Sequence, residues 1–230
     1  MLWNIWDAGS ARAVAVAGAK AVATGSWSVA AAQGFADGEA LPMAAALHTA
    51  KQIVDAVEVP VSVDFEGGYA VSPADVKANV AALIATGAIG LNFEDRIVGG
   101  EGLHDIEVQK ERIAAIKEAA NDAGVPIFIN ARTDVFFSGS KAPVETLLTE
   151  ALARASAYAE AGADGVFVPG INDLKIIAQI SDQQSLPLNV MRMGAGPEIS
   201  DLANAGVSRV SHGPGPYTAT MTALTASAVV

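Results

Sequence analysis

Seven short apolar segments, each led by a proline or a glycine, recur along most of the chain. The proline-led segments are Val59–Asp64, Val125–Asn130 and Leu186–Val190, and the glycine-led segments are Gly18–Ala23, Gly87–Asn92, Gly162–Phe167 and Gly206–Ser211. Each glycine follows an Ala-rich stretch, as the residue after a helix often does, and apolar runs of this length are typical of strands buried on both faces. The pattern therefore predicts helices that alternate with parallel strands.

The number of strands indicates how the sheet closes. With Met1–Trp6 as a first strand the chain has eight, which is the number in a TIM barrel. A chain of 230 residues fits one such barrel and leaves no room for a second sizeable domain. We therefore expect a single α/β domain over residues 1–230, a TIM-type (β/α)8 barrel with its chemistry at the C-terminal ends of the strands.

Stretches rich in Ala, Glu and Lys predict the helices around the barrel. They are Ser10–Ala17, Leu41–Val57, Pro73–Ala85, Glu107–Ala123, Val144–Ala161, Asp173–Ser181 and Glu198–Ala205, and 138–143 is predicted to be an ordinary connection. A last helix, Tyr217–Val230, offers few charges to water, and a helix without a polar face is usually buried. We expect this helix to pack in an oligomer interface, in a homodimer or a homotetramer.

The composition excludes several kinds of partner. A formal net charge of −11 and a pI near 4.6 repel nucleic acid and anionic membrane surfaces. The chain has no apolar run of about 18 residues and no basic start typical of a signal peptide, so we expect a cytoplasmic protein. Cysteine is absent, which excludes disulfides, thiolate metal ligands and a thiol acid or nucleophile.

Three acids follow the strands in the middle of the chain. Asp64 and Glu66 are two residues apart, so both carboxylates point into the barrel mouth if the strand continues through them, and Glu94 ends the neighbouring strand. Converging carboxylates repel one another, and a hard cation relieves the repulsion. We expect a Mg²⁺ site, which Mn²⁺ could also fill; the alternative is that these acids cap helices or pair with basic residues. Asp95 points the other way and has such a structural role.

Other groups at the strand ends suit an anionic ligand. The planar fork of Arg132 fits a substrate carboxylate or an enolate oxygen, and its alternative role is an ion pair with the barrel acids. Gly25, Ser26 and Trp27 follow the second strand, where successive backbone N–H groups can bind an anion. Asn189, in the seventh strand, is a further candidate for substrate binding.

A glycine-rich loop, Val98–Asp105, follows the fourth strand and is a candidate for an active-site lid, with a mobile surface turn as the alternative. It carries Glu101 and His104, which could move protons. Asp37 stands in a loop and by itself is a turn residue. No pair of histidines has metal-ligand spacing, which excludes a zinc site of the usual kind.

Taken in order, six motifs resemble those of the isocitrate lyase and phosphoenolpyruvate mutase superfamily. They are Asp7–Arg12, Ala23–Ser28, Val63–Tyr69, Asn92–Asp95, Asn130–Asp134 and Ala161–Asp164, and they cover nearly the whole chain. The resemblance implies a barrel enzyme that binds Mg²⁺ and a small 2-oxo acid and passes through a pyruvate enolate while a C–C or P–C bond is broken or made. It also implies a last helix exchanged between subunits.

The resemblance assigns roles to the residues above. Asp64, Glu66 and Glu94 match the acids that bind the metal, mostly through waters. Gly25, Ser26 and Trp27 match the loop that holds the carboxylate and oxo end of the substrate, and Arg132 matches the substrate-side arginine. Asp37 matches an aspartate near the metal and becomes a catalytic candidate.

Departures from the family pattern narrow the choice among the family's reactions. The C–C lyases of the family carry a lid cysteine, and this chain has Gly-Gly-Glu-Gly-Leu-His in the lid and no cysteine. The phosphonate branch has a lid asparagine and a histidine after strand six, where this chain has Glu101 and Pro169. An acid near a transferring phosphoryl group is electrostatically unfavourable. Decarboxylation or hydrolysis of oxaloacetate therefore fits better than phosphonopyruvate chemistry, and a catalytically weak 2-oxo acid binding protein is the alternative to an enzyme.

Overall fold

Eight parallel strands form the centre of the molecule. The computed structural model describes residues 1–137 and 141–228. The strands pair in chain order, each with the next. They are β1 (Asn4–Ile5), β2 (Val22–Thr24), β3 (Val61–Asp64), β4 (Gly90–Glu94), β5 (Phe128–Arg132), β6 (Gly165–Val168), β7 (Leu188–Met191) and β8 (Arg209–Ser211). A parallel bridge between Leu2 and Ser211 joins the two edges, so the sheet closes into a nearly complete barrel and confirms the predicted TIM-like fold.

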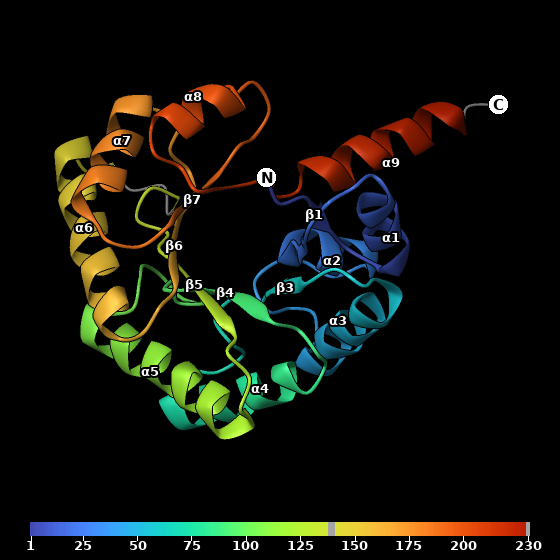
Figure 1. Cartoon of the computed structure of the whole chain (residues 1–230), viewed down its shortest axis with the longest axis horizontal. Helices are drawn as coiled ribbons and strands as arrows, with labels where there is room; N and C mark the ends of the chain where they lie inside the picture. Colours follow the sequence, from blue (N-terminus) through green and yellow to red (C-terminus); the bar gives the residue numbers. More distant parts are fainter. Residues whose placement is uncertain (138–140, 229–230) are drawn as a thin grey trace.

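Helices surround this barrel on its outside (Figure 1). Their bounds are α1 (Ala8–Val16), α2 (Ser26–Ala32), α3 (Met43–Ala56), α4 (Pro73–Ile84), α5 (Ile106–Ala123), α6 (Val144–Glu160), α7 (Leu174–Gln183), α8 (Ile199–Asn204) and α9 (Gly215–Ser227). Their apolar faces and the strands form two large clusters of buried side chains. The core therefore lies mostly between the barrel wall and the helices, and the mouth of the barrel stays available for polar groups.

The glycines that predicted the strands are needed where helices turn into strands. Gly162 follows α6 with a φ of 99°, and Gly206 follows α8 with a φ of 85°, a region in which side chains are strained. At Gly206 a Cβ would also lie 2.2 Å from Ser181 Oγ. These positions therefore allow the chain to reverse closely from helix to strand.

Two helices differ from the prediction in an informative way. α1 begins at Ala8 and not at Ser10, because the Asp7 carboxylate accepts a hydrogen bond from the Ser10 backbone and forms a capping box. α2 was not predicted as a helix, because Ser26 and Trp27 were assigned to an anion-binding loop. Residues 138–140 of the predicted connection and residues 229–230 of the last predicted helix lie outside the described residues.

The last helix leaves the barrel. α9 extends away from the other elements (Figure 1), and none of its described residues is buried. Its first turn packs on the barrel through Tyr217, whose ring meets Trp6 and Trp27 edge-on. Further along, Leu224 is 59% exposed. Within the described residues no helix has both the length and the apolarity that a membrane crossing needs.

We predict that α9 packs against a second copy of the chain, because an uncharged helix gains free energy when its surface leaves water. The protein should then run as a homodimer or homotetramer in light scattering at micromolar concentration. Replacing Met221 and Leu224 together by Glu should give monomers, and Val16→Glu, at an 89% exposed site on α1, should not. A wild-type protein that is monomeric in this assay would contradict the prediction.

Candidate active site

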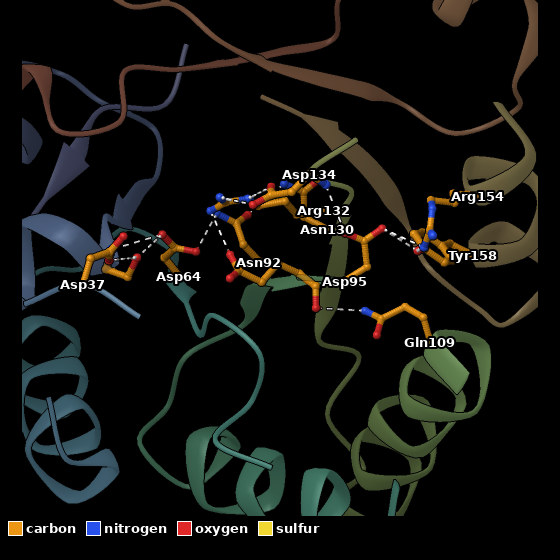
Figure 2. A network of polar contacts seen from close by, with 12 residues as sticks. Asp37, Asp64, Asn92, Asp95, Gln109, Asn130, Arg132, Asp134, Arg154 and Tyr158 are labelled. Carbon is orange, nitrogen blue, oxygen red and sulfur yellow. Dashed lines mark hydrogen bonds and ion pairs between the residues drawn. The ribbon is translucent and has the colours of Figure 1, made fainter. Parts of the chain in front are cut away.

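A cavity of about 120 Å³ lies at the C-terminal ends of the strands, and we call it the mouth cavity. Its polar lining includes Ser26, Asp37, Asp64, Asn92 and Arg132. Figure 2 shows most of these side chains and the polar contacts that lead from Arg132 into the interior. Six of the predicted site residues therefore meet here, namely Ser26, Asp37, Asp64 and Arg132 together with Gly25 and Trp27, as expected for the active end of a parallel barrel.

Ser26 joins the two aspartates of the mouth cavity. Its backbone N–H and its hydroxyl donate to Asp64 Oδ2 at 3.0 and 2.9 Å, and the hydroxyl lies 3.4 Å from Asp37 Oδ1. The Ser26 N–H, which the sequence assigned to a substrate anion, is thus taken by Asp64. Burial and the nearby charge of Asp64 raise the pKa of Asp37, whereas Arg132 opposes this shift.

The strand geometry separates Glu66 from Asp64. β3 ends at Asp64, and Glu66 has a φ of 49°, so the alternation of a continuous strand does not extend to it. Glu66 Oε2 accepts a hydrogen bond from the Glu39 backbone at 2.6 Å, and Glu66 lines a second, smaller cavity of about 20 Å³ that it shares with Asp64. Burial, with repulsion from Asp64 and Asp37, raises the pKa of Glu66 to about 8.

Arg132 is held from two sides by acids. Its Nε and Nη2 donate to Asp134 at 2.6 and 2.9 Å, and its Nη1 lies 3.0 Å from Glu94 Oε2. Burial alone lowers the pKa of Arg132, but Glu94 and Asp134 outweigh it and the pKa is raised overall. Burial raises the pKa of Glu94 to about 8 although Arg132 opposes the shift. Glu94 is thus an ion-pair partner in this structure, the alternative that the sequence left open.

The fit of the acids to a metal ion depends on how it is bound. Within the described residues, no group of three His, Asp or Glu side chains is placed to ligate one ion directly. Asp37, Asp64 and Glu66, however, form no ion pair in that part of the chain and present only oxygen donors, which suit Mg²⁺. Mg²⁺ usually keeps several waters, so these acids fit a hydrated ion held partly through water.

The candidate lid lies outside the mouth cavity. The segment 96–104 folds back on itself, with a bridge between Arg96 and Leu103 and a hydrogen bond from Ile97 N to Gly102 O. Glu101 is exposed, and His104 lines a different cavity, of about 260 Å³, beside Arg112. The structure therefore does not bring these two residues to Arg132, and their role in proton transfer stays a prediction.

Asn189 lies below the mouth cavity and does not line it. Its side-chain oxygen accepts a hydrogen bond from Asn130 at 3.1 Å, and Asn130 also donates to Asn92 at 2.8 Å. Three asparagines from β4, β5 and β7 thus form a buried polar layer inside the barrel. Only Asn92 reaches the mouth cavity, where its amide lies 3.4 Å from Asp64.

Sequence reasoning missed the residues that hold Arg132 in place. Asp134 is fully buried, and its backbone N–H donates to Asp95 Oδ1 at 3.0 Å. Asp95 in turn accepts hydrogen bonds from Tyr158 at 2.7 Å and Arg154 at 3.2 Å (Figure 2). The structural role predicted for Asp95 agrees with these contacts. The spacing of Asp134 two residues after Arg132 was the available signal, whereas nothing local marks Arg154 or Tyr158.

We predict that Asp134→Asn destabilises the protein by about 3 kcal/mol in urea unfolding, because removing one member of a buried ion pair leaves the other uncompensated. Glu150→Gln is the control, since Glu150 is 42% exposed in its ion pair with Arg154 and should cost less than about 1 kcal/mol. Equal losses in the two variants would contradict the role given to Asp134.

Comparison with known proteins identifies the family. The family model described as phosphoenolpyruvate phosphomutase matches residues 1–229. A solved "putative phosphonomutase" from Burkholderia cenocepacia J2315 is 50% identical, superimposes with a TM-score of 0.95, and is matched over 98% of this chain and 90% of its own.

Two curated relatives are more distant. An uncharacterized protein of Mycobacterium tuberculosis (strain CDC 1551 / Oshkosh) is 35% identical over 95% of this chain and 79% of its own length. An oxaloacetate decarboxylase of Pseudomonas savastanoi pv. phaseolicola is 32% identical over 77% of this chain and 60% of its own. With the family model matching nearly every residue, the chain belongs to the phosphoenolpyruvate phosphomutase family, within the phosphoenolpyruvate mutase and isocitrate lyase superfamily.

Proposed function

We propose that this protein is a Mg²⁺-dependent enzyme, able to use Mn²⁺, that acts on a small 2-oxo acid through a pyruvate enolate. The observation that supports this most is the meeting, in one mouth cavity, of Arg132 with the carboxylates of Asp37 and Asp64. Members of the superfamily are Mg²⁺-dependent lyases and mutases that act on 2-oxo acids. A fixed cation beside acids that suit a metal can bind an anionic substrate and stabilise its enolate.

Arg132 is the residue that binds the substrate in this proposal. Asp134 and Glu94 fix its guanidinium in one orientation, so little reorganisation is needed when negative charge develops on the enolate oxygen. Asp64 and Glu66, with Glu94 as the third predicted acid, would hold the metal, partly through water. When bound, the metal would supply Lewis-acid stabilisation of the oxo and carboxylate oxygens.

Proton transfer is assigned first to Asp37. It lines the mouth cavity, and the raised pKa that burial and Asp64 give it makes its carboxyl a better proton carrier near neutral pH. Glu101 and His104 are a second possibility, which requires the segment 98–105 to move toward the mouth. Trp27, 41% exposed at the rim, would cover a bound ligand from the side of α2.

C–C chemistry of the oxaloacetate type is favoured over P–C chemistry. The lid carries Glu101 and the loop after β6 carries Pro169, so neither adds the asparagine or the histidine of the phosphonate branch. A catalytically weak 2-oxo acid binding protein is the second candidate, and the position of Glu101 and His104 outside the mouth cavity favours it. Turnover distinguishes the two, because only an enzyme consumes a 2-oxo acid that it binds.

We predict that Arg132→Lys lowers catalytic efficiency on the best 2-oxo acid of a panel by at least about tenfold, because Lys keeps the charge but loses the two-pronged contacts. The panel contains oxaloacetate, phosphonopyruvate and alkylmalates, assayed with Mg²⁺ and with EDTA. Arg12→Lys is the matched control, since Arg12 is exposed and its Nε donates to the Ala56 carbonyl at 3.4 Å.

Near wild-type kinetics of the Arg132→Lys variant would contradict the role of this residue. Binding of oxalate without turnover of any panel member would favour the binding protein.

A further inference from the structure

The mouth cavity has two walls of different chemistry. Most of the polar groups come from one side of the barrel, between the end of β2 and β5, and Asn4 on β1 and Ser211 on β8 complete the polar lining. The other side, from the loop after β5 to the loop after β8, contributes apolar side chains, namely Phe137, Phe167, Met191, Met193 and Pro214. We call these five residues the apolar wall.

The apolar wall begins directly beside Arg132. The rings of Phe137 and Phe167 have centroids 5.4 and 5.7 Å from the Arg132 guanidinium carbon. A ligand carboxylate held by Arg132 therefore has its remaining atoms within reach of these rings. Phe137 and Met193 are 44% and 46% exposed, so a large apolar surface at the rim is open to water until a ligand covers it.

The side chains on the side of the apolar wall do not suit a second anionic group of the ligand. Among the described residues, Arg132 is the one cation that lines the mouth cavity. Three of its five N–H groups contact Asp134 and Glu94, and the proposed function assigns the other two to the first ligand carboxylate. Arg192 follows Met191 in the chain but is turned away, with its Nε 2.6 Å from the Pro197 carbonyl and its Nη2 3.1 Å from Glu198. A phosphonate or a distal carboxylate placed on the apolar wall would lose water without gaining a partner.

We propose that the group on the reacting carbon of the 2-oxo acid, the part that lies against the apolar wall, is an uncharged alkyl group. The proposal rests on the function proposed above and narrows its oxaloacetate type to substrates whose reacting carbon carries an alkyl group as well as the carboxylate that leaves, together with the alkyl-substituted 2-oxo acids that they release. It separates this chain from relatives whose ligand carries a phosphonate at that position.

Calorimetry on the protein with Mg²⁺ tests the proposal through binding alone. The ligands are oxalate as a reference, the series pyruvate, 2-oxobutanoate and 2-oxopentanoate, and the doubly anionic 3-phosphonopyruvate and 2-oxoglutarate. Each added methylene should tighten binding by about fourfold until the cavity is filled, which is the gain from burying one CH₂. The two doubly anionic ligands should bind at least about tenfold more weakly than 2-oxopentanoate.

Two variants localise the effect. Phe137→Ala should reduce the gain per methylene, which is a comparison within the alkyl series of one variant, and Phe128→Ala, at a 38% exposed site at the other end of β5, should not reduce it. Met193→Lys places a cation on the exposed rim and should shift the preference toward 2-oxoglutarate by about tenfold relative to 2-oxopentanoate. Measurable oxalate binding with Mg²⁺ shows in each case that the variant is folded.

The outcomes separate this inference from the function on which it rests. Oxalate binding with a flat alkyl series, or with 3-phosphonopyruvate as the tightest ligand, would overturn the inference and leave the proposed function standing. Failure of oxalate to bind in the presence of Mg²⁺ would overturn the proposed function and this inference together.

Discussion

A charge buried at the mouth of a barrel is costly unless opposite charges pair with it. Arg132 meets this condition because Asp134 binds two of its nitrogens and Glu94 the third. The acids differ in what holds them. Asp134 is fixed through Asp95, whereas Glu94 is a strand residue and also a candidate metal ligand. The position of Arg132 therefore depends on a network that reaches from the mouth to α6.

The same network connects the mouth to the candidate lid. Arg154, on α6, contacts the Asp95 carboxylate and also donates to the backbone carbonyl of His104 at 2.9 Å. The His104 N–H donates to the Asp95 carbonyl at 2.8 Å. The C-terminal end of the glycine-rich segment is thus anchored to the group that positions Asp134. Movement of that segment would have to occur between Arg96 and Leu103, where Gly99, Gly100 and Gly102 permit it.

The repeat of glycines and prolines predicted the fold well, because each marks a place where the backbone itself limits what can follow. Asp64 and Arg132 were placed correctly at the mouth for the same reason, since both end a strand. Glu66 was harder to place, because its position depended on a strand that stops two residues earlier at Asp64. Arg154 and Tyr158 could not be predicted as partners of Asp95, because about sixty residues separate them and only the packing of α6 brings them together. The apolar wall was missed for a similar reason, since apolar residues that lie in or just after four different strands have no common pattern in the sequence.

The central claim is that Arg132 and the acids of the mouth cavity bind a 2-oxo acid together with a divalent ion. A crystal structure of the protein with Mn²⁺ and oxalate tests it most directly, because anomalous scattering locates the Mn²⁺ independently of the oxalate density. We expect Mn²⁺ beside Asp64 and Glu66, with waters completing its coordination, and one oxalate carboxylate on Arg132 within the mouth cavity. Mn²⁺ bound elsewhere, or oxalate without contact to Arg132, would contradict it.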